Sequence, residues 1–141
     1  MKVKIKRLDK SLPLPDYHTK GAVAFDIYSR VDEIIGPHGR KIVPSNLIIE
    51  VPKGYVLVLA ARSSLSKKGL RLSNGIGIID QDYHGPQDEI SILLNNFTDQ
   101  SVEVKKGERI AQGFIIPVEK ADWEEVPEIK KESRGGFGST G

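Results

Sequence analysis

Leu47-Ile-Ile-Glu-Val51-Pro-Lys-Gly-Tyr55-Val-Leu-Val-Leu-Ala-Ala61 contains two short apolar runs on either side of a Pro-Lys-Gly turn. Runs this short and rich in Val, Ile and Leu are typical of strands rather than helices. The same arrangement recurs along the chain, with turn residues between runs at a spacing of roughly eight to twelve residues. This pattern predicts an all-β fold of short strands, which can be a sandwich, a jelly roll or a distorted β-barrel.

A long 3.6-residue apolar period is missing, so we expect one short helix, at residues 64–70, with Ser63 as its N-cap. From Trp123 the composition becomes polar and charged. We therefore expect a β-barrel domain at residues 1–125 and a flexible C-terminal tail with a Gly-rich lid motif at residues 126–141. The other expected strands are residues 3–7, 22–28, 34–35, 89–95, 102–105 and 109–118.

The composition excludes several classes of protein. A length of 141 residues indicates one domain, and a net charge of +2 without a Lys/Arg block gives no sign of a nucleic-acid partner. Disulfide and thiolate chemistry are excluded because the sequence has no cysteine. Residues 1–7 alternate basic and apolar side chains, unlike a signal peptide, and the apolar run at 55–61 is too short to span a bilayer. We expect a cytoplasmic protein without a membrane partner.

The stretch with the most chemical content is Asn74-Gly-Ile-Gly-Ile-Ile-Asp80-Gln-Asp-Tyr83-His-Gly85. An apolar strand that ends on Asp80 should place this carboxylate in dry surroundings, where its protonation can be tuned. The two glycines allow the backbone to approach a partner closely. Taken alone, the stretch is better explained as an ordinary β-hairpin with an acidic turn, since Asp and Gly are common turn residues.

The C-terminus, Ser133-Arg-Gly-Gly-Phe-Gly-Ser-Thr-Gly141, combines a Gly-rich backbone with hydroxyl side chains, one arginine and one aromatic ring. Such a segment can wrap phosphate oxygens, with Arg134 as a clamp and Phe137 stacked on a base. The alternative is a flexible tail without function. We expect disorder in the free chain and a functional role when the tail closes.

Two further segments place polar groups among apolar strands. Arg62-Ser63-Ser64 follows a buried strand, where it can form an anion site or a simple helix cap. Asp26 interrupts the apolar run 22–28, where it can hold the waters of a divalent cation or satisfy a sheet edge.

Arg109-Ile-Ala-Gln112 carries two polar side chains three residues apart in an expected strand, so they should point to opposite faces. Surface polarity explains this pair equally well. The histidines are dispersed without a zinc-type spacing, and we interpret His18 and His38 as surface residues.

Together these segments resemble, in order, the five motifs of the trimeric deoxyuridine triphosphatase (dUTPase) family. The resemblance covers nearly the whole chain and implies a jelly-roll homotrimer with active sites shared between subunits. It further implies hydrolysis of dUTP to dUMP and pyrophosphate, with Mg²⁺ as the cofactor. The matching segments are residues 22–29, 62–65, 74–89, 109–112 and 134–141.

The resemblance also implies roles for individual residues. Asp80 would be the general base for water attack on the α-phosphorus, and Ser63 would stabilise the leaving pyrophosphate. Asp26 would contribute to catalysis indirectly, by holding waters of Mg²⁺. Tyr83 would pack under the deoxyribose and exclude a 2′-hydroxyl. The remaining substrate-binding residues would be Arg62, Ser64, Asn74, Gly77, Ile79, Gln112, Arg134, Phe137, Gly138, Ser139 and Thr140.

The third motif departs from the family pattern, because His84 replaces an arginine and Pro86-Gln87-Asp88 separates Gly85 from Glu89. The related dCTP deaminases share an Arg-Ser-Ser-Leu segment but not the Gly-rich phenylalanine tail. Two alternatives stay open: a dCTP deaminase-like or bifunctional enzyme, and a non-catalytic nucleotide-binding module of the same fold.

Overall fold

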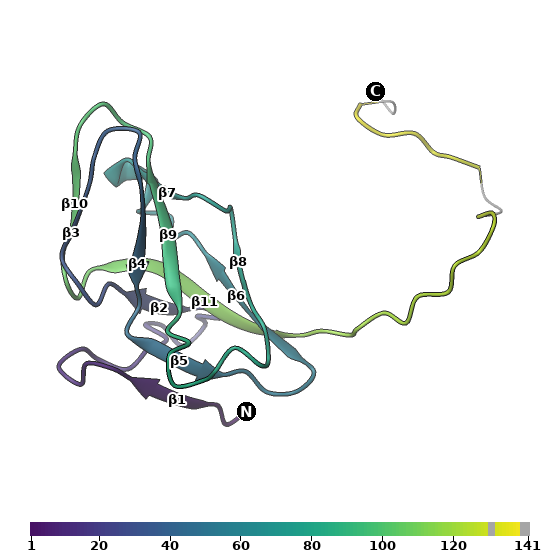
Figure 1. Cartoon of the computed structure of the whole chain (residues 1–141), viewed down its shortest axis with the longest axis horizontal. Coiled ribbons are helices and arrows are strands. Elements are labelled where there is room, and N and C mark those ends of the chain that lie inside the picture. Colours follow the sequence, from purple (N-terminus) through teal and green to yellow (C-terminus); the bar gives the residue numbers. More distant parts are fainter. Residues whose placement is uncertain (130–131, 139–141) are drawn as a thin grey trace.

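The structure is a computed structural model that describes residues 1–129 and 132–138. Figure 1 shows a body of short strands from which the C-terminal segment leads away. No helix in the described residues is long and apolar enough to cross a membrane. The elements are β1 (Lys4–Arg7), β2 (Phe25–Tyr28), β3 (Glu33–Ile35), β4 (Arg40–Pro44), β5 (Leu47–Glu50), β6 (Tyr55–Ala60), the 3-10 helix η1 (Ser66–Lys68), β7 (Leu70–Leu72), β8 (Gly77–Ile79), β9 (Ser91–Asn96), β10 (Val102–Val104) and β11 (Arg109–Pro117).

The strands pair antiparallel in a four-stranded sheet of order β2-β11-β6-β8, a three-stranded sheet of order β4-β9-β7, and two ribbons, β1-β5 and β10-β3. The strands β5 and β6 lie in different sheets although a short turn joins them. Gly54 in that turn has a φ of 81°, which a residue with a side chain rarely adopts. This architecture confirms the predicted all-β jelly-roll class.

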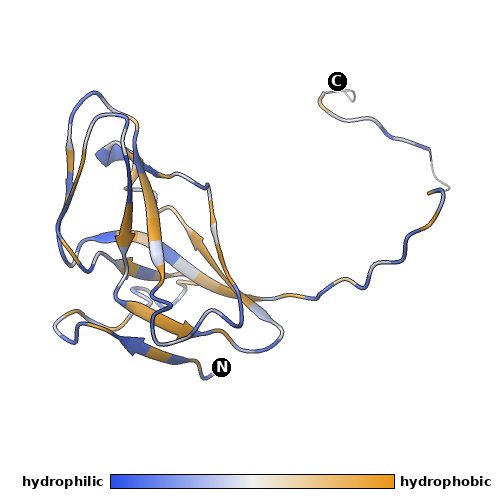
Figure 2. Cartoon of the chain, viewed as in Figure 1, coloured by the Kyte–Doolittle hydropathy of each residue, from blue (hydrophilic) through white to orange (hydrophobic). Residues whose placement is uncertain are grey.

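The core lies between the sheets and consists of the inward-facing side chains of nearly every strand. Figure 2 shows apolar residues concentrated along the strands and polar residues in the loops. Three successive residues of β6, Leu57 to Leu59, are buried, so both faces of the sheet are covered at this central strand. The largest fully buried side chains are Ile27, Ile35, Leu47, Leu57, Leu70, Ile90, Ile92, Leu94, Ile110, Val43, Val104 and Asn46.

Two strands and one helix cap differ from the sequence prediction. Strands β4 and β7 were not expected, since β4 contains charged residues and a proline, and β7 has only three residues. The helix is a single 3-10 turn that begins after buried Leu65, and its N-cap has no side-chain hydrogen bond. Ser63 as N-cap was therefore wrong, because burial of Leu65 starts the turn later in the chain.

The last strand ends at Pro117, and the Val118 N–H donates to the Gly54 carbonyl at 2.9 Å. Residues 119–129 and 132–138 contain no helix or strand, and their side chains are exposed. Figure 1 shows this segment extending away from the body. A domain boundary at residue 125 and a flexible tail beyond it remain predictions.

Packing around Gly113 in β11 leaves no room for a side chain. A Cβ there would lie 2.9 Å from the ring atoms Cε2 and Cζ of Phe25 and 3.1 Å from Cδ1 of Leu57. We expect Gly113→Ala to lower the free energy of unfolding by about 1–3 kcal/mol, because overpacking outweighs the entropic gain of alanine. Urea unfolding measures the change, and Gly21→Ala is the control, since a Cβ at Gly21 meets nothing within 4 Å. Equal stability of the two variants would contradict the packing argument.

Candidate active site

Asp26 is the centre of a charged cluster on β2. Its side chain is 9% exposed, and two guanidinium groups and an imidazole lie against its carboxylate. Arg62 Nε lies 2.7 Å from Oδ1, while His18 Nε2 and Arg109 Nη1 lie 2.8 Å and 3.2 Å from Oδ2. We call these four residues the Asp26 cluster.

The sheet register assembles this cluster from distant parts of the chain. Gln112 of β11 pairs with Asp26 on one side and with Ala60, the last residue of β6, on the other. The Gln112 amide donates to the Ala61 carbonyl at 2.8 Å, which fixes the loop that carries Arg62. The predicted segments around residues 26, 62 and 112 therefore meet at one place.

A β-bulge explains why both polar side chains of the 109–112 segment serve this cluster. The pairing between β11 and β2 shifts register between Arg109 and Ala111, so strict alternation is broken. Arg109 contacts Asp26, and Gln112 is its direct cross-strand partner. The prediction that Arg109 and Gln112 point to opposite faces was wrong, because it assumed an unbroken strand.

The charge balance of the Asp26 cluster favours the binding of an anion. One carboxylate faces two guanidinium groups and an imidazole, so positive charge and N–H donors remain for another partner. Arg109 is 45% exposed at its side chain, and Arg62 also donates to the Ser64 hydroxyl at 3.2 Å. Ser63 is exposed beside them. This arrangement suits the oxygens of a phosphate chain.

A second group of predicted residues lies along β8. Two adjoining hollows of about 130 and 250 Å³ share Ile78, Ile79 and Ser91 in their linings. The first is also lined by Asn74 and Gly77, and the second by Asp80 and Tyr83. The Asn74 amide at one end of the hollows and the Asp80 carboxylate at the other suit an elongated ligand. We call residues 74–83 the β8 arm.

The two glycines of the β8 arm have different structural roles. Gly75 has a φ of 74° in the turn before the strand, which favours glycine. Gly77 is buried, and a Cβ there would lie 3.0 Å from Cδ1 of Leu59. Packing against β6 therefore requires the small residue at Gly77, independently of any ligand.

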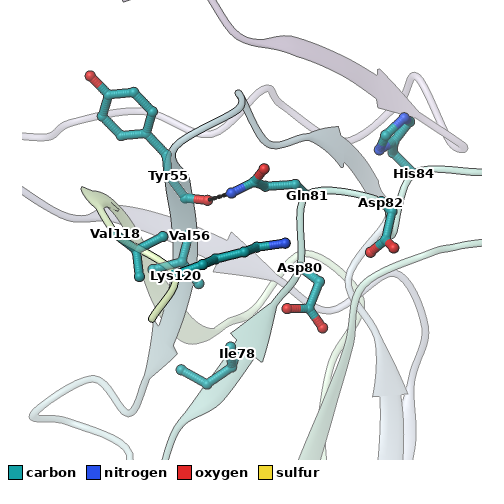
Figure 3. Close-up of a pocket in the computed structure, with 9 residues that line it drawn as sticks. All are labelled: Tyr55, Val56, Ile78, Asp80, Gln81, Asp82, His84, Val118 and Lys120. Carbon is teal, nitrogen blue, oxygen red and sulfur yellow. Dashed lines mark hydrogen bonds between the residues drawn. The ribbon is translucent and has the colours of Figure 1, made fainter. Parts of the chain in front are cut away.

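Hydrogen bonds fix the turn that carries Asp80. The Tyr83 N–H donates to the Asp80 carbonyl, and the Gln81 amide donates to the Tyr55 carbonyl at 3.0 Å (Figure 3). Figure 3 also shows Lys120 extending toward this turn across a pocket of about 570 Å³. Asp80 is exposed in the single chain. The dry surroundings that we predicted for its carboxylate would require another molecule to cover it.

Glu89 anchors the far end of this turn. Its carboxylate accepts from Arg30 Nε and Nη2 at 2.8 and 2.9 Å and from the Asn46 N–H at 2.7 Å, and it raises the pKa of Arg30 above the usual value. The Glu89 carbonyl in turn accepts from the Tyr83 hydroxyl at 3.3 Å. The ion pair between Arg30 and Glu89 thus fixes the residue whose carbonyl accepts the hydrogen bond of the Tyr83 hydroxyl.

The additional residues Pro86–Asp88 form a closed turn. The Gly85 N–H donates to Asp88 Oδ2 at 2.6 Å, and the Asp88 N–H donates to the Gly85 carbonyl at 3.1 Å. Because the loop closes on itself, Glu89 still reaches Arg30. The departure from the family pattern therefore leaves this connection intact.

The Asp26 cluster and Asp80 lie far apart within one chain. Strands β2 and β8 are opposite edges of the four-stranded sheet, and Asp80 is displaced along β6 from the level of Asp26. Three strand spacings and four residues of rise place the two carboxylates roughly 20 Å apart. The structure therefore does not bring the two groups together around one phosphorus atom.

The described tail residues, 126–129 and 132–138, make no side-chain hydrogen bond or ion pair with either group. Arg134, Phe137 and Gly138 are exposed, and Phe137 has a φ of 52°. Ser139 and Thr140 lie outside the described residues. The predicted roles of all five remain predictions.

Sequence reasoning missed two members of the Asp26 cluster. His18 was interpreted as a surface residue, and no local pattern shows that its loop returns to β2. Arg109 was noted, but its contact with Asp26 depends on the bulge. A buried carboxylate needs cationic partners, so Asp26 was the signal that could have prompted a search for them.

An all-β fold with an arginine-rich cluster and a separate pair of hollows that end at a carboxylate offers groups that suit the two parts of a phosphorylated nucleoside. A family model described as dUTPase matches residues 10–141. The deoxyuridine 5′-triphosphate nucleotidohydrolases of Nautilia profundicola and Anaplasma marginale are 44% and 42% identical to the chain, over 100% of it and 99% of each relative.

Solved structures agree with this match. A dUTPase of Staphylococcus bacteriophage 80alpha with dUPNHPP gives a TM-score of 0.87 at 27% identity, over 99% of this chain and 98% of that chain. The dUTPase of Streptococcus mutans gives a TM-score of 0.77 at 31% identity, over 84% of this chain and 98% of that chain. The chain belongs to the dUTPase family.

Proposed function

We propose that the chain hydrolyses dUTP to dUMP and pyrophosphate by attack of water on the α-phosphorus, with Asp80 as the general base. The observation that carries the proposal is the position of Asp80 at the end of the hollows along the β8 arm. A carboxylate there can accept a proton from a water that attacks the phosphate next to a bound nucleoside. A cytoplasmic location remains a prediction.

The β8 arm would select the nucleoside. Asn74 and the backbone of Gly77 and Ile79 line the inner hollow, where amide and carbonyl groups can read the uracil edge. A cytosine amino group would leave donors facing donors, which discriminates strongly against dCTP. Tyr83 lines the outer hollow beside Asp80, where its ring would occupy the space of a 2′-hydroxyl.

The Asp26 cluster would bind the phosphate chain. Arg62, Arg109 and Gln112 offer N–H donors, and Ser63 and Ser64 offer hydroxyl groups in the adjacent loop. Preorganised donors of this kind stabilise the charge that develops on a leaving pyrophosphate.

We place the Mg²⁺ ion on the substrate rather than in a site built by the protein. Among the described residues, no group of three His, Cys, Asp or Glu side chains could hold a metal. Both Asp26 oxygens already contact cationic side chains, so this carboxylate fits an ion only through the ion's bound waters. The bound ion would neutralise phosphate charge during the reaction.

We further propose that the active site is completed by other copies in a homotrimer. Asp80 must come within hydrogen-bond reach of the attacking water, whereas the Asp26 cluster of the same chain lies roughly 20 Å away. A neighbouring copy can supply the missing half. The tail would close as a lid from a third copy, with Phe137 on the uracil and Arg134, Gly138, Ser139 and Thr140 over the phosphates.

Asp80→Asn tests the general base. The amide keeps the shape of the side chain but cannot take the proton, so we expect kcat to fall about 10²–10⁴-fold. Binding of a non-hydrolysable dUTP analogue should stay within about threefold of wild type. Pyrophosphate release and calorimetry measure the two quantities, with dCTP and an ammonia assay as the control for deaminase activity. Activity close to wild type would exclude Asp80 as the base.

Tyr83→Ala tests sugar selection. Loss of the ring opens space beside Asp80, so the ratio of kcat/KM for dUTP to that for UTP should fall by about tenfold or more. Parallel turnover assays of both nucleotides give this ratio. A constant ratio in an otherwise active variant would show that the sugar is selected by other residues.

Mixing two inactive variants tests the shared site. Asp80→Asn and a chain truncated after Ile129 should each be inactive alone. Random trimers of equal amounts restore about a quarter of the sites, because each site then needs an intact Asp80 and an intact tail from different chains. Recovery should peak near equal amounts, and native mass spectrometry confirms mixed trimers. Mixed trimers without any activity at every ratio would refute the arrangement.

A further inference from the structure

The hydroxyl of Tyr83 is anchored outside the β8 arm. It donates to the backbone carbonyl of Glu89 at 3.3 Å, and this is the only side-chain hydrogen bond of Tyr83 among the described residues. The residue is 40% exposed, and its ring lines the outer hollow beside Asp80. The position of the ring in the hollow therefore depends on the Glu89 carbonyl.

The Glu89 side chain is held by two segments that lie elsewhere in the sequence. It is 15% exposed and accepts from Arg30, which follows β2, with one carboxylate oxygen at 2.8 Å and the other at 2.9 Å. The Asn46 N–H, between β4 and β5, donates to the same carboxylate at 2.7 Å. A bidentate pair of arginine and carboxylate fixes geometry as well as contributing energy. The Glu89 backbone is thereby restrained by groups that take no part in the two hollows.

Exclusion of a 2′-hydroxyl by a ring requires that the ring does not move aside. Functional side chains must be held within about 0.5 Å of the productive geometry by the contacts of their neighbours. A half-exposed tyrosine on a turn lacks the packing that would hold it, so its hydroxyl anchor has this role. We propose that Glu89 is a positioning residue, whose ion pair with Arg30 fixes the Tyr83 ring and so sets the preference for deoxyribose over ribose.

This inference rests on the proposed function, because it assumes that Tyr83 borders the sugar. A purely structural role for the ion pair would be to join the segments around Arg30 and Glu89. Backbone hydrogen bonds already join them, however. The Arg30 N–H donates to the Pro44 carbonyl at 2.9 Å, and the Ser45 N–H donates to the carbonyl of buried Ile90 at 3.0 Å. Variants of the ion pair should therefore fold.

The test measures the ratio of kcat/KM for dUTP to that for UTP. We expect Glu89→Ala to lower this ratio about fivefold, whereas Glu89→Gln, which keeps a side-chain acceptor, should stay within about twofold of wild type. Tyr83→Phe keeps the ring and removes the anchor, so it should lower the ratio as Glu89→Ala does. Glu33→Ala is the control, because Glu33 pairs with Lys41 at 3.3 Å and β3 belongs to another sheet. An unchanged ratio in Glu89→Ala, or an equal fall in Glu33→Ala, would overturn the proposal.

A double variant distinguishes positioning of the tyrosine from a general structural role. In a Tyr83→Ala background no ring is left to be positioned, so adding Glu89→Ala should change the ratio by less than about twofold. A second fall of about fivefold would show that Glu89 acts independently of Tyr83, which would refute the positioning role.

Calorimetry with dUDP and UDP separates this proposal from the proposed function, because it does not depend on turnover. Wild type should bind dUDP more tightly than UDP, and Glu89→Ala should reduce the difference about fivefold. A wild type that prefers dUDP but does not hydrolyse dUTP would refute only the hydrolysis. A wild type that hydrolyses dUTP, with unchanged selectivity in Glu89→Ala, would refute only the role of Glu89. Equal binding of both diphosphates by wild type would refute the positioning role as well. If Glu89→Ala does not fold, Arg30→Met, which removes the guanidinium donors, is judged by the same outcomes.

Discussion

The register of the four-stranded sheet sets the distance between the two carboxylates on which the chemistry depends. Asp26 and Asp80 lie on or beside opposite edge strands, with β11 and β6 between them. Hydrogen-bonded strands keep a nearly constant spacing, so side-chain movement cannot close this gap. The proposed phosphate-binding and nucleoside-binding groups therefore lie at opposite edges of the same sheet, so the proposed reaction needs a second copy of the chain to bring them together. Asp80 is exposed in the single chain, whereas the proposed role as general base would be favoured by its removal from water.

Burial of Asp26 links the fold to the phosphate-binding edge. An unpaired charge in this position would be strongly unfavourable, and two arginines from separate segments compensate it, with the His18 imidazole beside them. The carboxylate thereby orients guanidinium groups that would otherwise repel each other. A phosphate that enters finds donors already in place, which lowers the entropy lost on binding. Stability and recognition thus use the same contacts at this edge.

The sequence was sufficient to predict the long strands and the β8 arm, because apolar runs and Gly/Pro turns determine local structure. It was not sufficient for β4 and β7, whose few residues pair only because β9 lies between them. The Arg109 contact depends on a bulge, and the His18 contact depends on a loop that returns to β2. Both are products of tertiary structure that no periodicity encodes. Residue types suggested roles for Asp26 and Asp80 that remain predictions, while the sheet order decided that the two carboxylates do not meet in one chain.

In the tail, unlike in the barrel, the loss of conformational entropy on ordering is not compensated by burial of apolar side chains. Its Gly-rich backbone loses more conformational entropy on ordering than other sequences, and its apolar side chains are too few to compensate this loss alone. Phe137 is fully exposed and Trp123 is 90% exposed, so their apolar surface is available to a partner. Contacts with a bound nucleotide would supply the missing stabilisation, and closure would then depend on the ligand. If the tail acts as the proposed lid, it should open again once the product leaves, because the described tail residues contain no helix or strand that would hold it closed.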